Sequence, residues 1–245
     1  RLREAGVDVE IGPLGDAAAV QNAMFLHGLG DQTRPFLALK LATTLDGRIA
    51  DKFGRSRWIS GEPARDYVQW LRAGFDAIAI GGRTARLDDP ALTVRGPVRP
   101  RAAPRRVVFD RVADLGPNLT LVRTAAETPT VVVVSPEADR TRVKRLQAAG
   151  VTVVQANSLP ESLGLLREQG IASLLVEGGG QLAGALLAAG LVDRYYWIQA
   201  PVWLGEGAVP AFTGLPTRGL DQAERWRAVE RRSLGDDTLL VMDRG

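Results

Sequence analysis

A run of glycines between a short apolar segment and a helical pattern is the clearest chemical signal in the sequence. Residues 174–177 read Leu-Leu-Val-Glu, three glycines follow at 178–180, and a helical pattern continues to about residue 189. Successive glycines let backbone N–H groups turn toward an anion, and a helix start adds positive potential. The spacing G-x-G-x-x-A from Gly178 also satisfies the loose dinucleotide pattern. This turn is a candidate phosphate site; a tight strand–helix turn that binds nothing is the open alternative.

Lys40 and Glu177 are candidate acid–base or substrate-orienting groups. Lys40 lies in the apolar segment 36–43, where alternation predicts a strand with three leucines on one face and Lys40 between two alanines on the other. A buried ammonium group is costly without an anion nearby, which favours a proton donor or a clamp on substrate oxygen. The alternative is an edge strand that leaves Lys40 in water. Glu177 ends another predicted strand, where open α/β sheets bind ligands, although a solvated loop acid is the simpler interpretation.

A third candidate group combines arginines with a hydroxyl side chain. It contains Ser56, Arg72 and Arg95, with Trp58 and Thr84 nearby in the sequence. Guanidinium groups are preferred partners of phosphate oxygens, so these residues suit a phosphorylated substrate. Taken singly, each arginine is equally consistent with a solvated surface position.

The residue types that are missing exclude whole classes of site. The 245-residue sequence contains no cysteine and one histidine, His27, which we leave out of the candidate set. Disulfides, thiol nucleophiles, thiolate-bound metals and multi-histidine metal sites are therefore excluded within this sequence. Asp88-Asp89-Pro90 predicts a helix end and a turn rather than a metal site. Hydride transfer from an organic cofactor remains compatible with the composition.

Composition and charge favour a globular protein with a small anionic ligand. Hydrophobic residues make up 45% and charged residues 24%, which are ordinary globular values. The net charge of +3 suits a phosphorylated small molecule but is too small and scattered to indicate nucleic acid. No apolar stretch reaches the roughly 18 residues of a membrane span, and no signal peptide is visible. We therefore expect a cytoplasmic protein without a membrane partner.

Strand and helix patterns alternate through the middle of the chain and end in a hairpin. This order predicts an α/β fold with a mostly parallel sheet and a mixed edge. The predicted strands are 36–43, 76–80, 106–109, 131–134, 151–154, 174–177, 195–202, 225–234 and 238–242, and the predicted helices begin near 62, 138, 159 and 181. Before them, residues 1–33 form a separate piece, with a short strand at 7–11 and one helix that starts at Asp16 and passes Leu26.

Several motifs occur in an order that is specific to one family. They are Pro35-Phe36, Leu39-Lys40-Leu41-Ala42, Leu45-Asp46-Gly47-Arg48, Ser56-Arg57-Trp58-Ile59-Ser60, Asp88-Asp89-Pro90-Ala91-Leu92-Thr93-Val94-Arg95 and Glu177-Gly178-Gly179. In this order they closely resemble the reductase domain of the bifunctional bacterial riboflavin-biosynthesis deaminase/reductase, over about residues 34–245. Residues 1–33 look like the tail of the preceding deaminase domain and its linker, so an upstream deaminase domain is a possible partner. The deaminase zinc signature is absent from this sequence.

The resemblance implies a fold, a reaction and a set of contacts. The fold would be dihydrofolate-reductase-like, with a mixed, mostly parallel sheet flanked by helices. NADPH would reduce the ribosyl group of 5-amino-6-(5-phosphoribosylamino)uracil to a ribityl group. Substrate contacts would fall on Ser56, Arg72, Leu92, Arg95 and Glu177. Cofactor contacts would fall on Ala42, Trp58, Thr84, Asp88, Gly179, Gly180, Gln181, Leu182, Ala183, Gly184 and Ala185.

Two other functions stay open. One is the fungal and archaeal-type reductase that acts on the 2,5-diaminopyrimidine before deamination, and the remnant of a deaminase domain argues against it. The other is a nucleotide-binding domain without catalysis. We also expect a homodimer, because an edge strand such as 195–198 would pair with a second copy.

Overall fold

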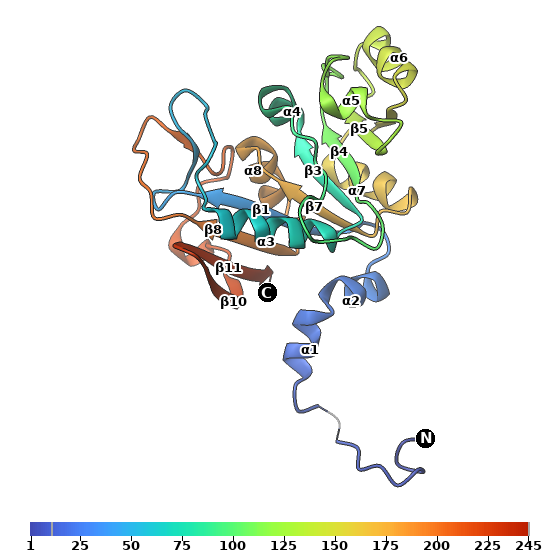
Figure 1. Ribbon diagram of the computed structural model, residues 1–245, viewed down its shortest axis with the longest axis vertical. Coiled ribbons are helices and arrows are strands. Elements are labelled where there is room, and N and C mark those ends of the chain that lie inside the picture. The colour runs from blue at the N-terminus through green and yellow to red at the C-terminus, as the bar shows by residue number, and fades with distance from the viewer. Residues whose placement is uncertain (11, 245) are drawn as a thin grey trace.

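A single mixed sheet of nine strands forms the centre of the protein, in a computed structural model that describes residues 1–10 and 12–244 (Figure 1). Seven neighbouring strands run parallel, and the last two at one edge form an antiparallel hairpin. From edge to edge the strands are β10 (Trp226–Leu234), β11 (Asp237–Arg244), β8 (Arg194–Gln199), β1 (Phe36–Thr43), β7 (Ser173–Glu177), β3 (Ala77–Gly81), β4 (Arg105–Phe109), β5 (Thr130–Val134) and β6 (Thr152–Gln155). This order confirms the predicted α/β fold with a mixed, mostly parallel sheet.

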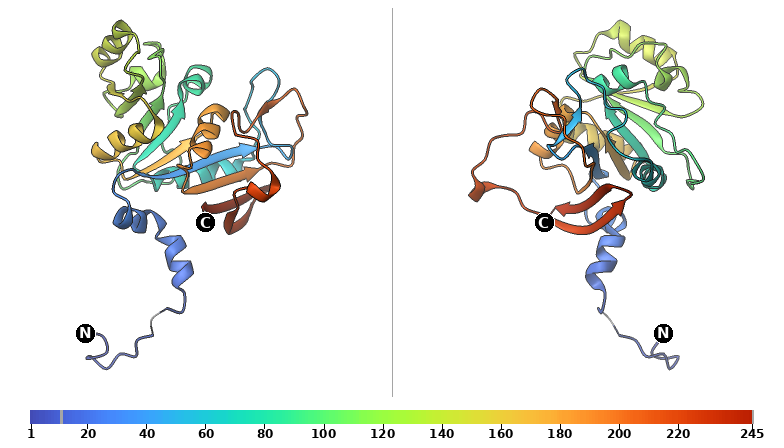
Figure 2. Two further views of the ribbon diagram at one scale, coloured as in Figure 1. Left: turned by 180° about the vertical axis from the view of Figure 1, so that it is seen from behind. Right: turned by 60° about the vertical axis from the view of Figure 1, so that its left-hand side comes forward.

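Helices cover both faces of the sheet (Figures 1 and 2). The leucines of β1 pack with α7 (Leu159–Glu168) and α8 (Gly180–Ala188) on one face. On the other face, α3 (Glu62–Ala73) packs against β1 and β8 through Val68 and Leu71. The helices α4 (Gly82–Asp88), α5 (Thr120–Arg123) and α6 (Arg140–Ala148) cover the same face over β3, β4 and β5. Burial on both faces explains why the inner strands are continuously apolar.

Strand β1 lies in the interior of the sheet, between β7 and β8. The predicted alternation is confirmed, since Leu37, Leu39 and Leu41 belong to one core cluster and Ala38 to the cluster on the opposite face. Lys40 is in register with Glu177 of β7 and with Tyr196 of β8. The alternative interpretation, an edge strand with Lys40 in water, is therefore wrong.

Strand β8 is also interior, which corrects the expected dimer contact. It pairs with β1 on one side and with β11 on the other, so residues 195–198 have no free edge for a second copy. The edge on this side of the sheet is β10. The strand ends at Gln199, earlier than predicted, because Pro201 has no N–H to donate to a ladder. The homodimer itself stays a prediction.

Two long loops beyond the carboxyl end of β1 are tied together by a small sheet that was not predicted. The strand β2 (Arg48–Ala50) pairs with β9 (Val209–Pro210), and a short 3₁₀ helix, η1 (Leu220–Gln222), follows. The Asp46 carboxylate accepts hydrogen bonds from the Thr44 hydroxyl and from the Gly205 backbone N–H. The Thr44 bond is the main cause that lowers the pKa of Asp46 to about 2. These contacts hold the two loops against each other over the end of the sheet (Figure 2).

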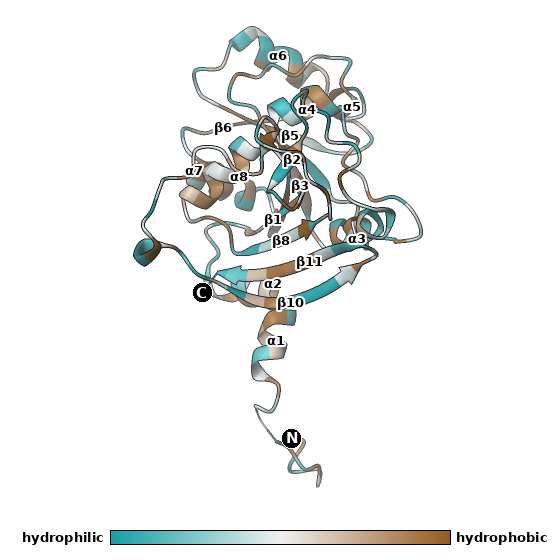
Figure 3. Ribbon diagram, turned by 90° about the vertical axis from the view of Figure 1, so that its left-hand side faces the viewer, coloured by the Kyte–Doolittle hydropathy of each residue, from teal (hydrophilic) through white to brown (hydrophobic). Residues whose placement is uncertain are grey.

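The N-terminal part of the first 33 residues forms an arm that extends away from the sheet (Figures 1 and 3). Further along this segment, Ala23 and Met24 pack against the core. The helices of the segment are α1 (Gly15–Gln21) and α2 (Ala23–Gly30), so the single predicted helix is wrong: the chain breaks at Asn22. The strand predicted at 7–11 is also wrong for residues 7–10, and Ile11 lies outside the described residues. Leu14 and Phe25 are exposed. Among the described residues, no helix is both long and apolar enough to cross a membrane.

Candidate functional site

A large cavity of about 1560 Å³ opens at the carboxyl ends of the parallel strands. Ends of β1, β3, β4 and β7 contribute to its wall, together with α3, α4, the start of α8 and the loop before α3. Of the candidate residues, the following line it: Lys40, Ala42, Ser56, Trp58, Arg72, Thr84, Asp88, Leu92, Arg95, Glu177, Gly179, Gly180, Gln181, Leu182 and Ala185. Residues spread over 140 positions of sequence therefore meet at one place, because parallel strands end at the same edge of a sheet.

Two residues of the glycine segment do not line the cavity. Ala183 has no exposed surface and belongs to the core beneath α8. Gly184 packs so closely on the loop at Thr213 that an added Cβ would collide with the Thr213 carbonyl group. The structure gives both residues a packing role, and a cofactor contact at either one would require the ligand to reach behind the helix.

Glu177 and Arg72 form a nearly buried ion pair at the floor of the cavity. The Arg72 Nε–H donates to Glu177 Oε1 at 2.6 Å, and Nη2–H donates to Oε2 at 2.8 Å. A third donor, Nη1–H, reaches the Thr93 carbonyl oxygen at 3.0 Å. The side chains are 11% and 10% exposed. Arg72 thus holds Glu177 in one orientation, and only part of its guanidinium remains available to a ligand.

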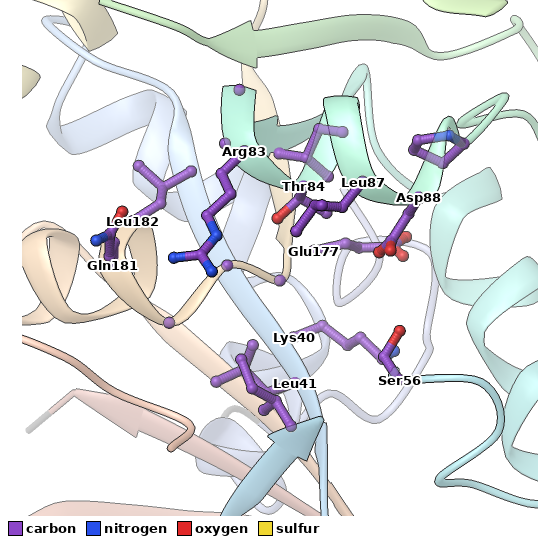
Figure 4. A pocket seen from close by; sticks show the side chains of 18 of the residues that line it. Lys40, Leu41, Ser56, Arg83, Thr84, Leu87, Asp88, Glu177, Gln181 and Leu182 are labelled. Atoms are coloured by element: carbon purple, nitrogen blue, oxygen red, sulfur yellow. The ribbon is translucent and has the colours of Figure 1, made fainter. Parts of the chain in front are cut away.

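Lys40 lies beside this pair and projects into the cavity, with Ser56 near its end (Figure 4). Burial lowers the pKa of Lys40, attraction to Glu177 opposes that shift, and repulsion from Arg72 adds to it. Burial alone would raise the pKa of Glu177, but attraction and hydrogen bonding to Arg72, together with attraction to Lys40 and Arg95, hold it below its usual value. The site therefore combines a fixed carboxylate with an ammonium group that releases its proton more readily than a lysine in water.

The glycine turn lies next to helix α4 in the cavity wall. Gly178 and Gly179 have φ values of 82° and 92°, which residues other than glycine adopt only under strain. An added Cβ at Gly179 would lie 3.1 Å from the Thr84 Oγ1 of α4. Beside Gly178 there is open space, since no heavy atom lies within 4 Å of an added Cβ. The backbone is thus exposed on the cavity side, as close approach by a ligand requires.

Trp58 and Asp88 lie nearer to the mouth of the cavity. Trp58 is 68% exposed, and the guanidinium carbon of Arg65 lies 4.7 Å from its ring centroid. Burial raises the pKa of Asp88, although attraction to Arg57 opposes the shift. Arg57 is anchored there, because its Nη2–H donates to the Asp88 carbonyl oxygen at 2.8 Å.

The cavity carries more basic side chains than the motifs indicated. Eight basic and five acidic side chains line it, so an anionic ligand is favoured. The basic lining residues outside the predicted candidate set are Arg57, Arg65, Arg83, Arg86 and Arg111. Arg83 and Arg86 flank Thr84 and Ala85 directly, and this spacing on a predicted helix was the signal available. Within the described ranges, no three His, Cys, Asp or Glu residues gather as a metal site would need.

Comparison with known proteins places this fold and cavity in a family. Residues 35–240 match the family model of the RibD C-terminal domain. The riboflavin biosynthesis protein RibD of Bacillus amyloliquefaciens is 35% identical over 214 residues, which cover 86% of this chain and 57% of the relative. RibD of Aquifex aeolicus is 31% identical over 244 residues, which cover 100% of this chain and 67% of the relative. The chain thus spans about three fifths to two thirds of these relatives.

Solved structures of two relatives are similar to this chain over nearly all of its length. RibD of Acinetobacter baumannii is 30% identical with a TM-score of 0.82, and the match covers 100% of this chain and 67% of that one. The Thermotoga maritima diaminohydroxyphosphoribosylaminopyrimidine deaminase/5-amino-6-(5-phosphoribosylamino)uracil reductase is 27% identical with a TM-score of 0.81, covering 99% and 66%. The expected dihydrofolate-reductase-like α/β fold is confirmed. The chain belongs to the RibD C-terminal domain family, the reductase family of riboflavin biosynthesis.

Proposed function

We propose that this chain reduces the ribosyl group of 5-amino-6-(5-phosphoribosylamino)uracil to a ribityl group with NADPH. The observation that carries the proposal is the position of the glycine turn and the Lys40–Glu177–Arg72 cluster in one basic cavity. The reductase activity for which the Thermotoga maritima relative is named supports the choice of substrate. An upstream deaminase domain, of which residues 1–33 would be the tail, is part of the same proposal.

The cavity fits a dinucleotide cofactor. The open space beside Gly178 and the basic excess of the lining suit a diphosphate at the start of α8. The contacts would come from Ala42, Trp58, Thr84, Asp88, Gly179, Gly180, Gln181, Leu182 and Ala185. When bound, the reduced nicotinamide would supply a hydride to C1 of the ribosyl group.

The protein's own groups would bind and orient the substrate. Arg95, exposed at the cavity mouth, and Ser56 would hold the 5-phosphate. Glu177, fixed by Arg72, would accept hydrogen bonds from the ribose or the pyrimidine. As the bond between C1 and the ring oxygen breaks, Lys40 would donate a proton to that oxygen or polarise it. Its lowered pKa makes this transfer easier.

The decisive experiment compares two substrates on the same purified chain. NADPH oxidation is followed by nicotinamide absorbance, and the gain of two hydrogen atoms in the product by mass spectrometry. Turnover of the uracil substrate well above that of the 2,5-diaminopyrimidine is the expected result. Faster turnover of the 2,5-diaminopyrimidine would assign reduction before deamination. If NADPH binds but is not oxidised in the presence of either substrate, the chain is a non-catalytic domain.

A further inference from the structure

Among the described residues Arg83 has no acidic partner, unlike Arg72 and Arg86 of the same cavity. Within the described part of the chain it makes neither an ion pair nor a hydrogen bond, whereas Arg86, on the same helix, pairs with Asp110 at 3.2 Å between Nη1 and Oδ1. The other acidic residue of the cavity floor, Glu177, is occupied by Arg72. The positive charge of Arg83 is therefore not neutralised by its surroundings.

The direction of the side chain shows where that charge acts. Arg83 extends from the start of α4 into the cavity, and its guanidinium group lies toward the turn between β7 and α8, close to Gln181 and Leu182 in this view (Figure 4). The two segments are near neighbours, because an added Cβ at Gly81 would lie 3.8 Å from the Leu182 Cβ. Arg83 therefore extends along the cavity wall toward the exposed backbone of the glycine turn (Figure 4).

Helix α4 begins in close contact with the segment that follows β4. An added Cβ at Gly82 would lie 2.6 Å from the Asp110 carboxylate, so only glycine lets α4 begin so close to the end of β4. The acidic residues Asp88 and Asp89 lie at the opposite end of α4, beyond the reach of Arg83 along the helix. An incoming anion at the glycine turn would meet backbone N–H groups on one side and a free guanidinium on the other.

We propose that Arg83 binds phosphate oxygen of the dinucleotide's diphosphate at the glycine turn. The inference rests on the proposed function and adds a binding residue that the sequence motifs did not indicate. A diphosphate is favoured over the 2′-phosphate of NADPH, because Arg83 faces the turn itself. Arg111 is less suited to a contact at the glycine turn, because it follows β4, which lies two strands away from β7 in the sheet.

The test measures binding directly, by isothermal titration calorimetry of NADPH and NADH against the full chain. Arg83→Ala removes one charge-assisted contact, so the Kd for both dinucleotides should rise by the same factor, about tenfold. Arg83→Lys should recover part of the affinity, because it keeps the charge without the planar fork. Arg140→Ala, an exposed residue of α6 outside the cavity, is the matched control and should leave both Kd values unchanged.

The outcomes separate this inference from the proposed function. If Arg83→Ala weakens NADPH but not NADH, the residue reads the 2′-phosphate, and the diphosphate contact is refuted. Unchanged Kd values in Arg83→Ala, with tight binding by the unmodified chain, overturn the inference alone. If the unmodified chain binds neither dinucleotide, the proposed function fails first. Thermal unfolding of each variant checks that a change in Kd does not reflect loss of the folded protein.

Discussion

Arg72 and Glu177 connect helix α3 to the end of strand β7 through two hydrogen bonds of 2.6 and 2.8 Å. The two residues are 105 positions apart in the sequence. Their pairing places a charged carboxylate in a largely buried position next to Lys40. The same contact therefore supports the fold and prepares the candidate site.

Removal of either partner should destabilise the protein. Arg72→Ala or Glu177→Ala leaves one nearly buried charge without a partner, which costs about 3 kcal/mol of unfolding free energy. Urea unfolding of both single variants and of the double variant forms a complete cycle. The double variant should lose less than the sum of the two, by about 1 kcal/mol or more, because it leaves neither member of the pair as a charge without its partner. Additive losses would contradict this account of the pair.

The ion pair of Glu177 with Arg72 should make the free energy of unfolding depend on pH. The pKa of Glu177 is lower in the folded protein than its ordinary value, so its contribution is complete above that ordinary value. It should be lost as the pH falls through the lower, folded-state pKa. Unfolding of the unmodified chain and of Glu177→Gln across this range should show a stability gap that narrows on acidification. Glu168→Gln, an exposed change on α7, should show no comparable narrowing.

Lys40→Met tests the proton donor. The substitution keeps an unbranched side chain in an interior strand, so the fold and the NADPH affinity should stay near those of the unmodified chain. Turnover should fall by about a hundredfold or more, because a positioned acid is missing. Single-turnover absorbance measurements and NADPH titration separate the two effects. Equal turnover in this variant would refute a catalytic role for Lys40.

Arg95→Ala tests the phosphate contact at the cavity mouth. Arg95 is exposed, and its backbone N–H is held by the Gln69 side chain at 2.9 Å, so the loop should keep its position without the guanidinium. The KM for the phosphorylated substrate should rise about tenfold, while kcat changes little. Arg99→Ala, in the same loop but outside the cavity, is the control. An unchanged KM would show that the Arg95 side chain does not contact the substrate.

The regular elements of the sheet could be predicted because their signals are local. Continuous apolar runs marked the buried strands, and the alternation in β1 marked its two faces. The N-terminal arm shows the limit of the same method. Residues 7–10 alternate like a strand but form none, and no strand of the described residues pairs with them. The strands β2 and β9, which pair with each other, were not predicted because each is too short to show an alternation of polar and apolar residues.

Sequence alone indicated which residues are candidates for chemistry: the glycine turn, Lys40, and the arginines whose types suit phosphate. Tertiary structure decided what each one contacts. Lys40 is an interior residue because β1 lies between β7 and β8. Arg72 pairs with Glu177 because the fold brings α3 next to the end of β7. Residue type and periodicity depend on neighbours along the chain, whereas strand order and charge pairing depend on segments more than a hundred residues away, which no local pattern records.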